Sequence, residues 1–215
     1  MNRTILIAQT KTADYIANYR DVDKFIECCK VCKQYRSSWS CPSFNSDPKA
    51  GYVNRAIPDI ERFELTTVIG VKIHIDEQTR HQAKDLDERN ELIKDILLTV
   101  RQQIDGKLLA LEQQTPDSLL FYAGTCRLCM PEPCSRVENK PCRQPDKMRS
   151  TLEAYGFDMG RTTSEFLGVK MKWCKDLELP PYFTLVYGLL SNKSVLDVIE
   201  SVSFSEEQEV RIIKK

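Results

Sequence analysis

The sequence predicts an α/β or α+β fold in which a central mixed sheet is flanked by helices. Apolar runs rich in β-branched residues alternate with helical segments along the chain, one long segment carries a single apolar stripe, and cysteine-rich loops lie at the end of the expected sheet. With 215 residues, 41% of them apolar, the chain is long enough for one substantial core. We expect a single domain over residues 1–193 and a C-terminal extension over residues 194–215.

The N-terminal half is expected to contain two strands and two helices. Thr4 to Gln9 is a short apolar run of strand character, and the β-branched stretch from Leu65 to Ile75 suits a strand buried on at least one face. Asp21 to Tyr35 is typical of a helix, and Ser40 to Gly51 is typical of a loop. The clearest helix runs over about Thr79 to Glu112, where apolar residues recur at helical spacing. They are Leu86, Ile93, Leu97, Val100, Ile104, Leu108 and Leu111.

The C-terminal half continues the alternation. Leu119 to Ala123 is expected to be a short strand that leads into a cysteine-rich loop, the position where ligand-binding loops are found in mixed folds. Lys147 to Tyr155 and Ser164 to Met171 are predicted helices, and Tyr182 to Leu190 is a strongly apolar predicted strand.

Two positions in these elements allow more than one interpretation. Gly106 is a position at which the long helix could bend or divide. Ser205 to Gln208 resembles the capping box of a terminal helix, whereas Val210 to Ile213 could equally be a strand.

Charge and hydropathy exclude several classes of protein. The 31 basic and 31 acidic residues balance and are dispersed along the chain, which argues against a general nucleic-acid binder. The sequence has no run of about eighteen apolar residues, which is the length needed to span a bilayer, and no recognisable signal peptide. We therefore expect a cytoplasmic protein that does not bind membranes. Disulfides do not persist in that compartment, so clustered cysteines there indicate metal binding or catalysis.

Four of the nine cysteines form a compact later group within seventeen residues. Cys126 and Cys129 form a Cys-x-x-Cys turn, which lets two thiolates face one centre while intervening amides donate weak hydrogen bonds to sulfur. Cys134 and Cys142 are near enough in sequence to complete the ligand set. Prolines at 131, 133, 141 and 145 restrict the loop and lower the entropy cost of gathering the ligands.

An earlier group supplies three further candidate ligands: Cys29, Cys32 and Cys41. The adjacent Cys28 is awkward as a fourth ligand, because neighbouring helical side chains diverge by about 100 degrees. Cys174 or an exchangeable ligand could also close this site.

Several segments together resemble a family of uncharacterised predicted metal-binding proteins of anaerobic prokaryotes. They are Cys29 to Tyr35, Trp39 to Pro42, Ala123 to Cys129, Pro141 to Pro145 and Ser150 to Asp158. The resemblance covers most of residues 25–190 and implies a cysteine-bound metal, of iron–sulfur type, without an established reaction. It supports all seven candidate ligands but neither Cys28 nor Cys174. This chain departs from the family pattern in one cysteine spacing, where Met130 to Pro133 makes four residues in place of the usual two.

The expected function is to carry one or two iron–sulfur clusters of the 4Fe–4S type, for electron transfer or for support of a partner redox enzyme. The residues alone leave the metal open, because four thiolates suit both zinc and iron–sulfur clusters and the cysteine spacing is irregular for both. Arg127, Arg136 and Arg143 could offset the negative charge of a cluster. Two alternatives are a zinc-stabilised interaction module, in which metal supplies folding energy, and a cluster-dependent redox enzyme with an open metal position at the three-cysteine site.

Overall fold

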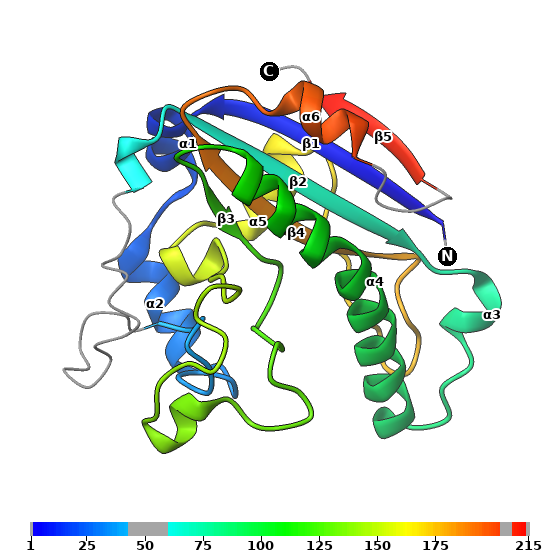
Figure 1. Cartoon of the computed structure of the whole chain (residues 1–215). Coiled ribbons are helices and arrows are strands. Elements are labelled where there is room, and N and C mark those ends of the chain that lie inside the picture. The colour runs from blue at the N-terminus through cyan, green and yellow to red at the C-terminus, as the bar shows by residue number, and fades with distance from the viewer. Residues whose placement is uncertain (1, 43–59, 203–207, 214–215) are drawn as a thin grey trace.

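The computed structural model describes residues 2–42, 60–202 and 208–213, and five strands in these ranges form one mixed sheet (Figure 1). The strands are β1 (Arg3–Lys11), β2 (Leu65–His74), β3 (Leu119–Phe121), β4 (Tyr182–Ser191) and β5 (Gln208–Ile213). Their order in the sheet is β3-β4-β2-β1-β5. Only the β1–β5 pair is parallel among these neighbours, and the other pairs are antiparallel. The predicted fold class and the predicted strands are therefore confirmed.

Both faces of the sheet are buried, which explains the continuous apolar runs in its central strands. Side chains alternate along β1, so that Ile5 and Ile7 join one core cluster while Leu6 and Ala8 join another. The structure thus has helices on both sides of the sheet.

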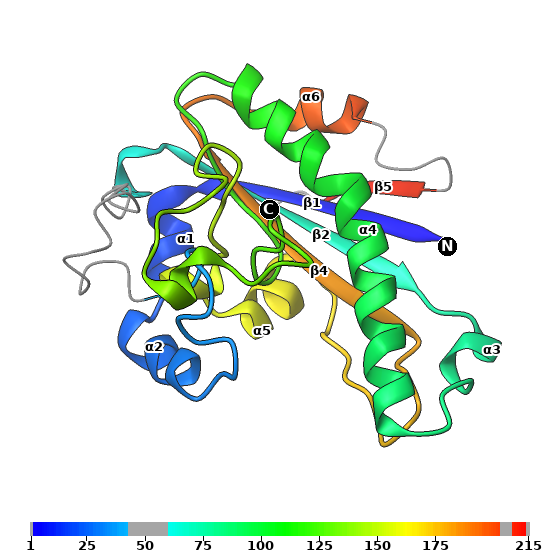
Figure 2. The same cartoon turned by 60° about the horizontal axis from the view of Figure 1, so that its bottom comes forward.

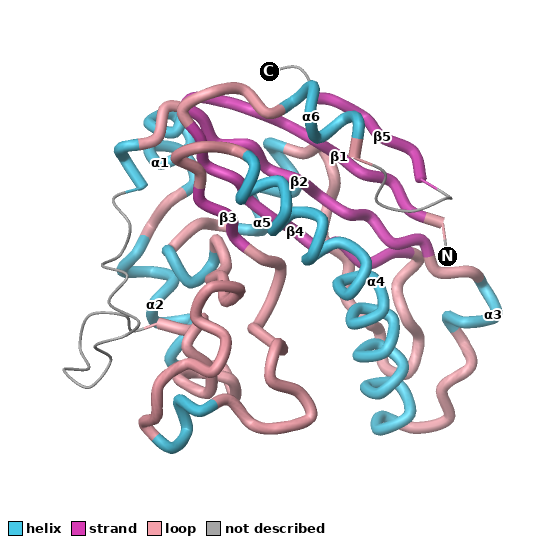
Figure 3. Tube along the Cα trace, in the orientation of Figure 1, coloured by secondary structure: helices cyan, strands magenta, loops and turns pink. Residues whose placement is uncertain are grey.

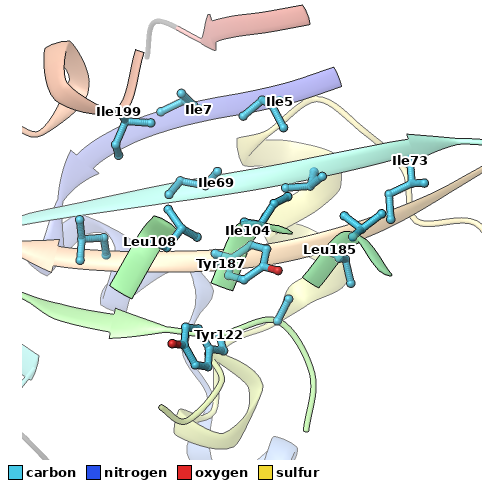
Figure 4. Close-up of a cluster of buried hydrophobic side chains, with 14 of the residues drawn as sticks. Ile5, Ile7, Ile69, Ile73, Ile104, Leu108, Tyr122, Leu185, Tyr187 and Ile199 are labelled. Atoms are coloured by element: carbon cyan, nitrogen blue, oxygen red, sulfur yellow. The ribbon is translucent and has the colours of Figure 1, made fainter. Parts of the chain in front are cut away.

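One face is covered by the long helix α4 (Leu86–Gln114) and by α6 (Leu196–Ser201), as Figure 2 shows. Figure 4 shows Ile104 and Leu108 of α4 packed over the sheet. The predicted apolar stripe is confirmed from Ile93 to Leu111, which face the core, whereas Leu86 at the start of the helix is exposed. Gly106 does not divide α4 into separate helices. The C-terminal residues contribute α6 to this layer and β5 to the edge of the sheet, so the strand interpretation of 210–213 is confirmed. Residues 203–207 lie outside the described residues, and they include most of the proposed capping box, Ser205 to Gln208.

The long helix begins later than predicted. A short helix, α3 (Glu77–Arg80), precedes it and is separated from it by residues 81–85. The side chain of Asp85 accepts hydrogen bonds from the amides of Asp87 and Glu88, at 2.9 and 2.8 Å, and this cap fixes the start of α4. The prediction of one helix from Thr79 is wrong at this end.

The other face is covered by short elements. They are α1 (Thr12–Tyr19), α5 (Met159–Arg161), the π-helical turn η4 (Thr162–Phe166) and the 3₁₀ turns η1 (Ile60–Arg62) and η3 (Glu153–Tyr155). The buried ring of Tyr15 stacks on Phe157 with centroids 4.8 Å apart, and its hydroxyl lies 2.9 Å from the hydroxyl of Thr162. This layer supports α2 (Val22–Lys30), which carries the first cysteines, so the predicted helix over 21–35 is confirmed but shorter.

Two predicted helices are wrong. In Lys147 to Tyr155 only the 3₁₀ turn η3 is helical, because the backbone is held by tertiary contacts: Ser150 accepts a hydrogen bond from the Tyr122 amide at 2.8 Å. In Ser164 to Met171 the turn η4 ends at Phe166, and Gly168 then adopts a positive φ of 70° that no helix continues. The predicted loop Ser40 to Gly51 lies largely in residues 43–59, outside the described residues.

Gly156 fixes the approach of α2 to the sheet layer. It has a φ of 86°, its carbonyl accepts a hydrogen bond from the Asp21 amide at 2.8 Å, and a Cβ added to it would lie 2.7 Å from Val22 Cα. We expect Gly156→Ala to lower the free energy of unfolding by about 1–3 kcal/mol or more, measured by urea denaturation. Gly168→Ala is the matched control, since it has a similar φ but nothing within 4 Å of its added Cβ. Equal effects of the two substitutions would contradict the steric account.

No helix in the described part of the chain has both the length and the apolar character that crossing a membrane requires.

Candidate metal centre

The later cysteine group lies in the loop that follows β3, and the earlier group lies in the last turn of α2 and in the turns after it. Figure 3 shows these loops gathered below the sheet, and the loop after β3 lies beside α2 and the turns that follow it in Figures 1 and 2. All nine cysteines fall in the described residues and are free thiols. The expectation of cysteine-rich loops at the sheet end is confirmed.

The later group surrounds one cavity. Cys126, Cys129, Cys134 and Cys142 all line a cavity of about 280 Å³. Trp39, which is 2% exposed, packs with Met148 against three of these cysteines. An aromatic ring and a thioether therefore exclude water from one side of the thiol-lined cavity.

The earlier group lines a second cavity of about 210 Å³, to which Cys29, Cys32 and Cys41 contribute. Cys29 comes from the last turn of α2, whose first turn is capped by Asp21, and Cys32 follows in the next turn of the chain. Cys28 and Cys174, the alternatives for a fourth ligand, do not line this cavity. Cys28 is exposed, and Cys174 packs against the core beneath α4.

The two cavities adjoin, because Gln34 and Thr125 line both. Hydrogen bonds also connect the two cysteine segments, which are about ninety residues apart in sequence. Arg136 Nη1 donates to the carbonyls of Ser38 and Cys41, each at 2.7 Å. The guanidinium lies 5.2 Å from the centroid of the Trp39 ring. Arg136 is buried, and its hydrogen bonds join the two segments.

Two further hydrogen bonds connect the same segments. Trp39 Nε1 donates to the Lys140 carbonyl at 3.1 Å, and the Cys126 amide donates to Ser40 Oγ at 3.1 Å. The two thiol groups are thus parts of one packed unit.

Backbone amides donate to three of the sulfur atoms. The amide of Gln34 lies 3.4 Å from Cys32 Sγ, and the amide of Gln144 lies 3.4 Å from Cys142 Sγ. The Leu128 amide donates to Cys126, as expected for a Cys-x-x-Cys turn. Such hydrogen bonds stabilise a thiolate and tune any metal that it binds.

Burial opposes thiolate formation while no cation is near. It raises the pKa of the Cys126 thiol to about 11 and also raises the pKa of Cys142 and of Cys29. Neighbouring thiols raise the pKa of each of the three further, because a second negative charge disfavours ionisation. A bound cation reverses this balance, so metal binding must displace protons from these sites.

Comparison with known protein families identifies the chain. The model of the family described as predicted metal-binding protein (DUF2284) matches residues 15–188. The chain belongs to this family. The match spans both cysteine groups, and the expected resemblance to a family of metal-binding proteins is confirmed. Neither the curated proteins nor the solved structures include a match to the chain.

The thiols of this DUF2284 protein line the walls of the cavities and do not converge on one point. Within residues 2–42, 60–202 and 208–213, no three His, Cys, Asp or Glu side chains are close enough together to hold a single metal ion as they stand. A single zinc ion would draw its sulfur ligands to about 2.3 Å from one position. Binding therefore requires either closure of the loops or a centre larger than one ion.

A third cavity of about 340 Å³ lies on the other side of Cys126, between the loop and α4. Arg101 and Asp105 of α4 line it and form an ion pair of 3.1 Å. Arg101 also donates to the Thr125 carbonyl at 2.8 Å, and Tyr187 donates to Asp105 at 2.8 Å. Burial raises the pKa of the Asp105 carboxyl, whereas Arg101 opposes that rise. The cavity thus combines a buried charge pair with a candidate ligand cysteine.

A buried ion pair between Glu112 and Arg149 holds the far end of the cysteine loop of this family member. Arg149 Nε lies 2.9 Å from both carboxylate oxygens of Glu112, and Glu112 Oε1 also accepts from the Leu120 amide at 2.7 Å. Arg149 Nη1 donates to the Asp146 and Met148 carbonyls, at 2.9 and 2.8 Å. These contacts join α4, β3 and the chain that returns from Cys142. Sequence reasoning missed the pair, since charges 37 residues apart carry no local signal.

Sequence reasoning also missed Glu153, which lines the cavity of the earlier cysteine group. Although the residue as a whole is half-buried, its Oε2 is enclosed and has no hydrogen-bond partner in the described residues. Burial raises the pKa of its carboxyl. The sequence gives no sign that Glu153 lines this cavity, because the turn η3 determines where its side chain lies.

Proposed function

We propose that this protein carries two iron–sulfur clusters of the 4Fe–4S type, one in each cysteine-lined cavity, and transfers electrons through them. The observation that supports this most strongly is that the two cavities share the walls formed by Gln34 and Thr125. Two redox centres held side by side can exchange electrons directly, as the two clusters of a ferredoxin do. One face of such a unit would serve a protein redox partner.

The shape of the sites favours a cluster over a single ion. Four thiols line a cavity of about 280 Å³ in the later group, and the described side chains do not meet at a single-ion position. A cubane binds each thiolate at a different corner, so it suits thiols that are spread around a cavity. Zinc suits thiols that converge on one point.

The surroundings of the sulfur atoms also suit iron–sulfur chemistry. Amides donate to Cys32, Cys126 and Cys142, and hydrogen bonds to the ligand sulfurs together with exclusion of solvent set the reduction potential of a cluster. Trp39 supplies that exclusion beside the later group. Free thiols at all nine cysteines fit a reducing compartment, and we propose a cytoplasmic location.

Absorption spectroscopy under anaerobic conditions tests the proposal. We expect the purified protein to be brown, with a broad visible absorption that dithionite bleaches, because reduction of a cluster weakens its sulfur-to-iron charge-transfer bands. Cys126→Ser should remove about half of this absorption. Cys28→Ser is the control and should leave the absorption unchanged, since Cys28 lines neither cavity. A colourless protein would sink the proposal.

A cluster-dependent redox enzyme is a second candidate, favoured by the cavity of about 340 Å³ beside Cys126. Arg101 and Asp105 could orient a small polar molecule there, next to the cluster that would exchange electrons with it. A compound that occupied this cavity should shift the absorption of the wild-type cluster.

A further inference from the structure

The cavity of the earlier cysteine group has one ligand position that no cysteine fills. Cys29, Cys32 and Cys41 line it, while Cys28 and Cys174 do not. Tetrahedral metal sites and cubane clusters both take four ligands from their surroundings. The structure therefore has to supply the fourth ligand from another residue type or leave it to an external molecule.

Among the described residues that line this cavity, Glu153 is the one carboxylate. It is the first residue of η3, and the hydroxyl of Thr151 and the amide of Glu153 itself donate to its carboxylate. Oε2 has no hydrogen-bond partner among the described residues and is closed to solvent. The carboxylate is thus held in place, while one of its oxygens lacks the partner that a bound metal would supply.

Among its described lining residues, the cavity has no positive charge to compensate for this carboxylate. Its described lining consists of cysteines, Glu153 and neutral residues, and includes no Lys, Arg or His. Glu153 also interacts electrostatically with the Cys29 thiol. An enclosed carboxylate beside three thiols is costly unless it is neutralised, since an unpaired buried charge costs several kcal/mol. A bound metal cation would supply the missing charge to all four groups at once.

We propose that the Glu153 carboxylate is the fourth protein ligand of the metal centre held by Cys29, Cys32 and Cys41. This inference rests on the proposed function in that it requires metal in this cavity, but it holds for an iron–sulfur cluster and for zinc alike. A carboxylate oxygen is a harder ligand than a thiolate and binds these metals less firmly. The centre held by the earlier group then exchanges its fourth ligand more readily than the later centre, in which all four ligands are cysteines.

Metal content in matched variants tests this assignment. Glu153→Gln keeps the shape of the side chain and removes its charge, and Glu27→Gln is the control on α2, where Glu27 is exposed and pairs with Lys30. Each protein is loaded anaerobically with ferrous iron and sulfide, and iron per chain and the rate of iron release to a chelator are measured. We expect Glu153→Gln to lose as much iron as Cys32→Ser, or to release it roughly tenfold faster or more, while Glu27→Gln matches the wild type.

Combined variants and stability measurements separate a ligand from a structural residue. Glu153→Gln/Cys32→Ser should retain as much iron as Cys32→Ser alone, whereas Glu153→Gln/Cys142→Ser should lose the iron of both centres. Metal-free Glu153→Gln should unfold at the same or a higher temperature than metal-free wild type, because an enclosed carboxyl has been removed. Wild-type iron content and release in Glu153→Gln, or a clear loss of stability in its metal-free form, would overturn the assignment.

The outcome is distinguishable from failure of the proposed function. If the wild type takes up zinc and forms no cluster, the iron–sulfur proposal fails, and the same comparison is made with zinc content. A selective loss of zinc from the earlier group in Glu153→Gln would then support the ligand assignment. Wild-type zinc content in that variant would overturn it.

Discussion

Glu112→Ala is expected to lower the free energy of unfolding by about 3–5 kcal/mol, because it leaves the buried guanidinium of Arg149 without its partner. Arg149 and Glu112 are 8% and 9% exposed, and their oxygens and nitrogens meet at 2.9 Å. The substitution also removes the acceptor of the Leu120 amide at the edge of the sheet. Urea denaturation of the metal-free protein measures the effect without the contribution of bound metal.

Glu91→Ala is the matched control for this substitution. Glu91 lies on the same helix and pairs with Lys94 at 2.7 Å, but its side chain is 65% exposed. Surface pairs of this kind contribute roughly 0–1 kcal/mol. Since the buried pair also anchors the chain that returns from Cys142, Glu112→Ala should weaken metal binding at the later group. A cost close to that of Glu91→Ala would show that the ion pair does not hold the loop.

Removal of the metal is expected to have a second large effect, this time on thermal stability. A metal present at 100 times its Kd stabilises the folded state by about 2.7 kcal/mol. For a chain of this size that corresponds to roughly 5–11 °C in Tm. A chelator should lower the Tm of the wild type by at least this amount, and Cys142→Ser should reproduce part of the loss because Cys142 lines the later cavity. Differential scanning calorimetry under anaerobic conditions measures both.

The direction of the pH dependence of metal binding follows from the thiols. The pKa of Cys126 is raised to about 11, and the pKa of Cys142 is also raised, so protons compete with the metal at neutral pH. Metal affinity should therefore fall as the pH is lowered. Cys28→Ser is the control and should keep the wild-type Tm with and without chelator, and an unchanged Tm of the wild type on chelation would contradict a structural role for the metal.

The parts of the fold that were predictable are those with strong local periodicity. The β-branched runs that became β1 and β2 and the apolar stripe of α4 are properties of neighbouring residues. The errors arose where distant contacts determine the backbone. The chain over 147–152 is not helical because Arg149 reaches Glu112 and Ser150 pairs with Tyr122.

The candidate site was predictable only in its local groups. Cysteine spacing indicated Cys126 to Cys142 and Cys29 to Cys41 as two ligand sets, and each set lines one cavity. The contact between the two cavities could not be predicted from sequence. It depends on hydrogen bonds of Arg136 and Trp39 that connect segments about a hundred residues apart. Glu153 was missed for the same reason: its burial is a property of the packed loops and not of its sequence neighbours.

Elemental analysis of anaerobically purified protein tests the central claim most directly. Iron, acid-labile sulfide and zinc are measured per chain in the wild type and in Cys142→Ser. Two 4Fe–4S clusters correspond to about eight iron and eight sulfide per chain, and we expect these values to fall by half in Cys142→Ser, with zinc near zero throughout. Stoichiometric zinc without sulfide in the wild type would contradict the account.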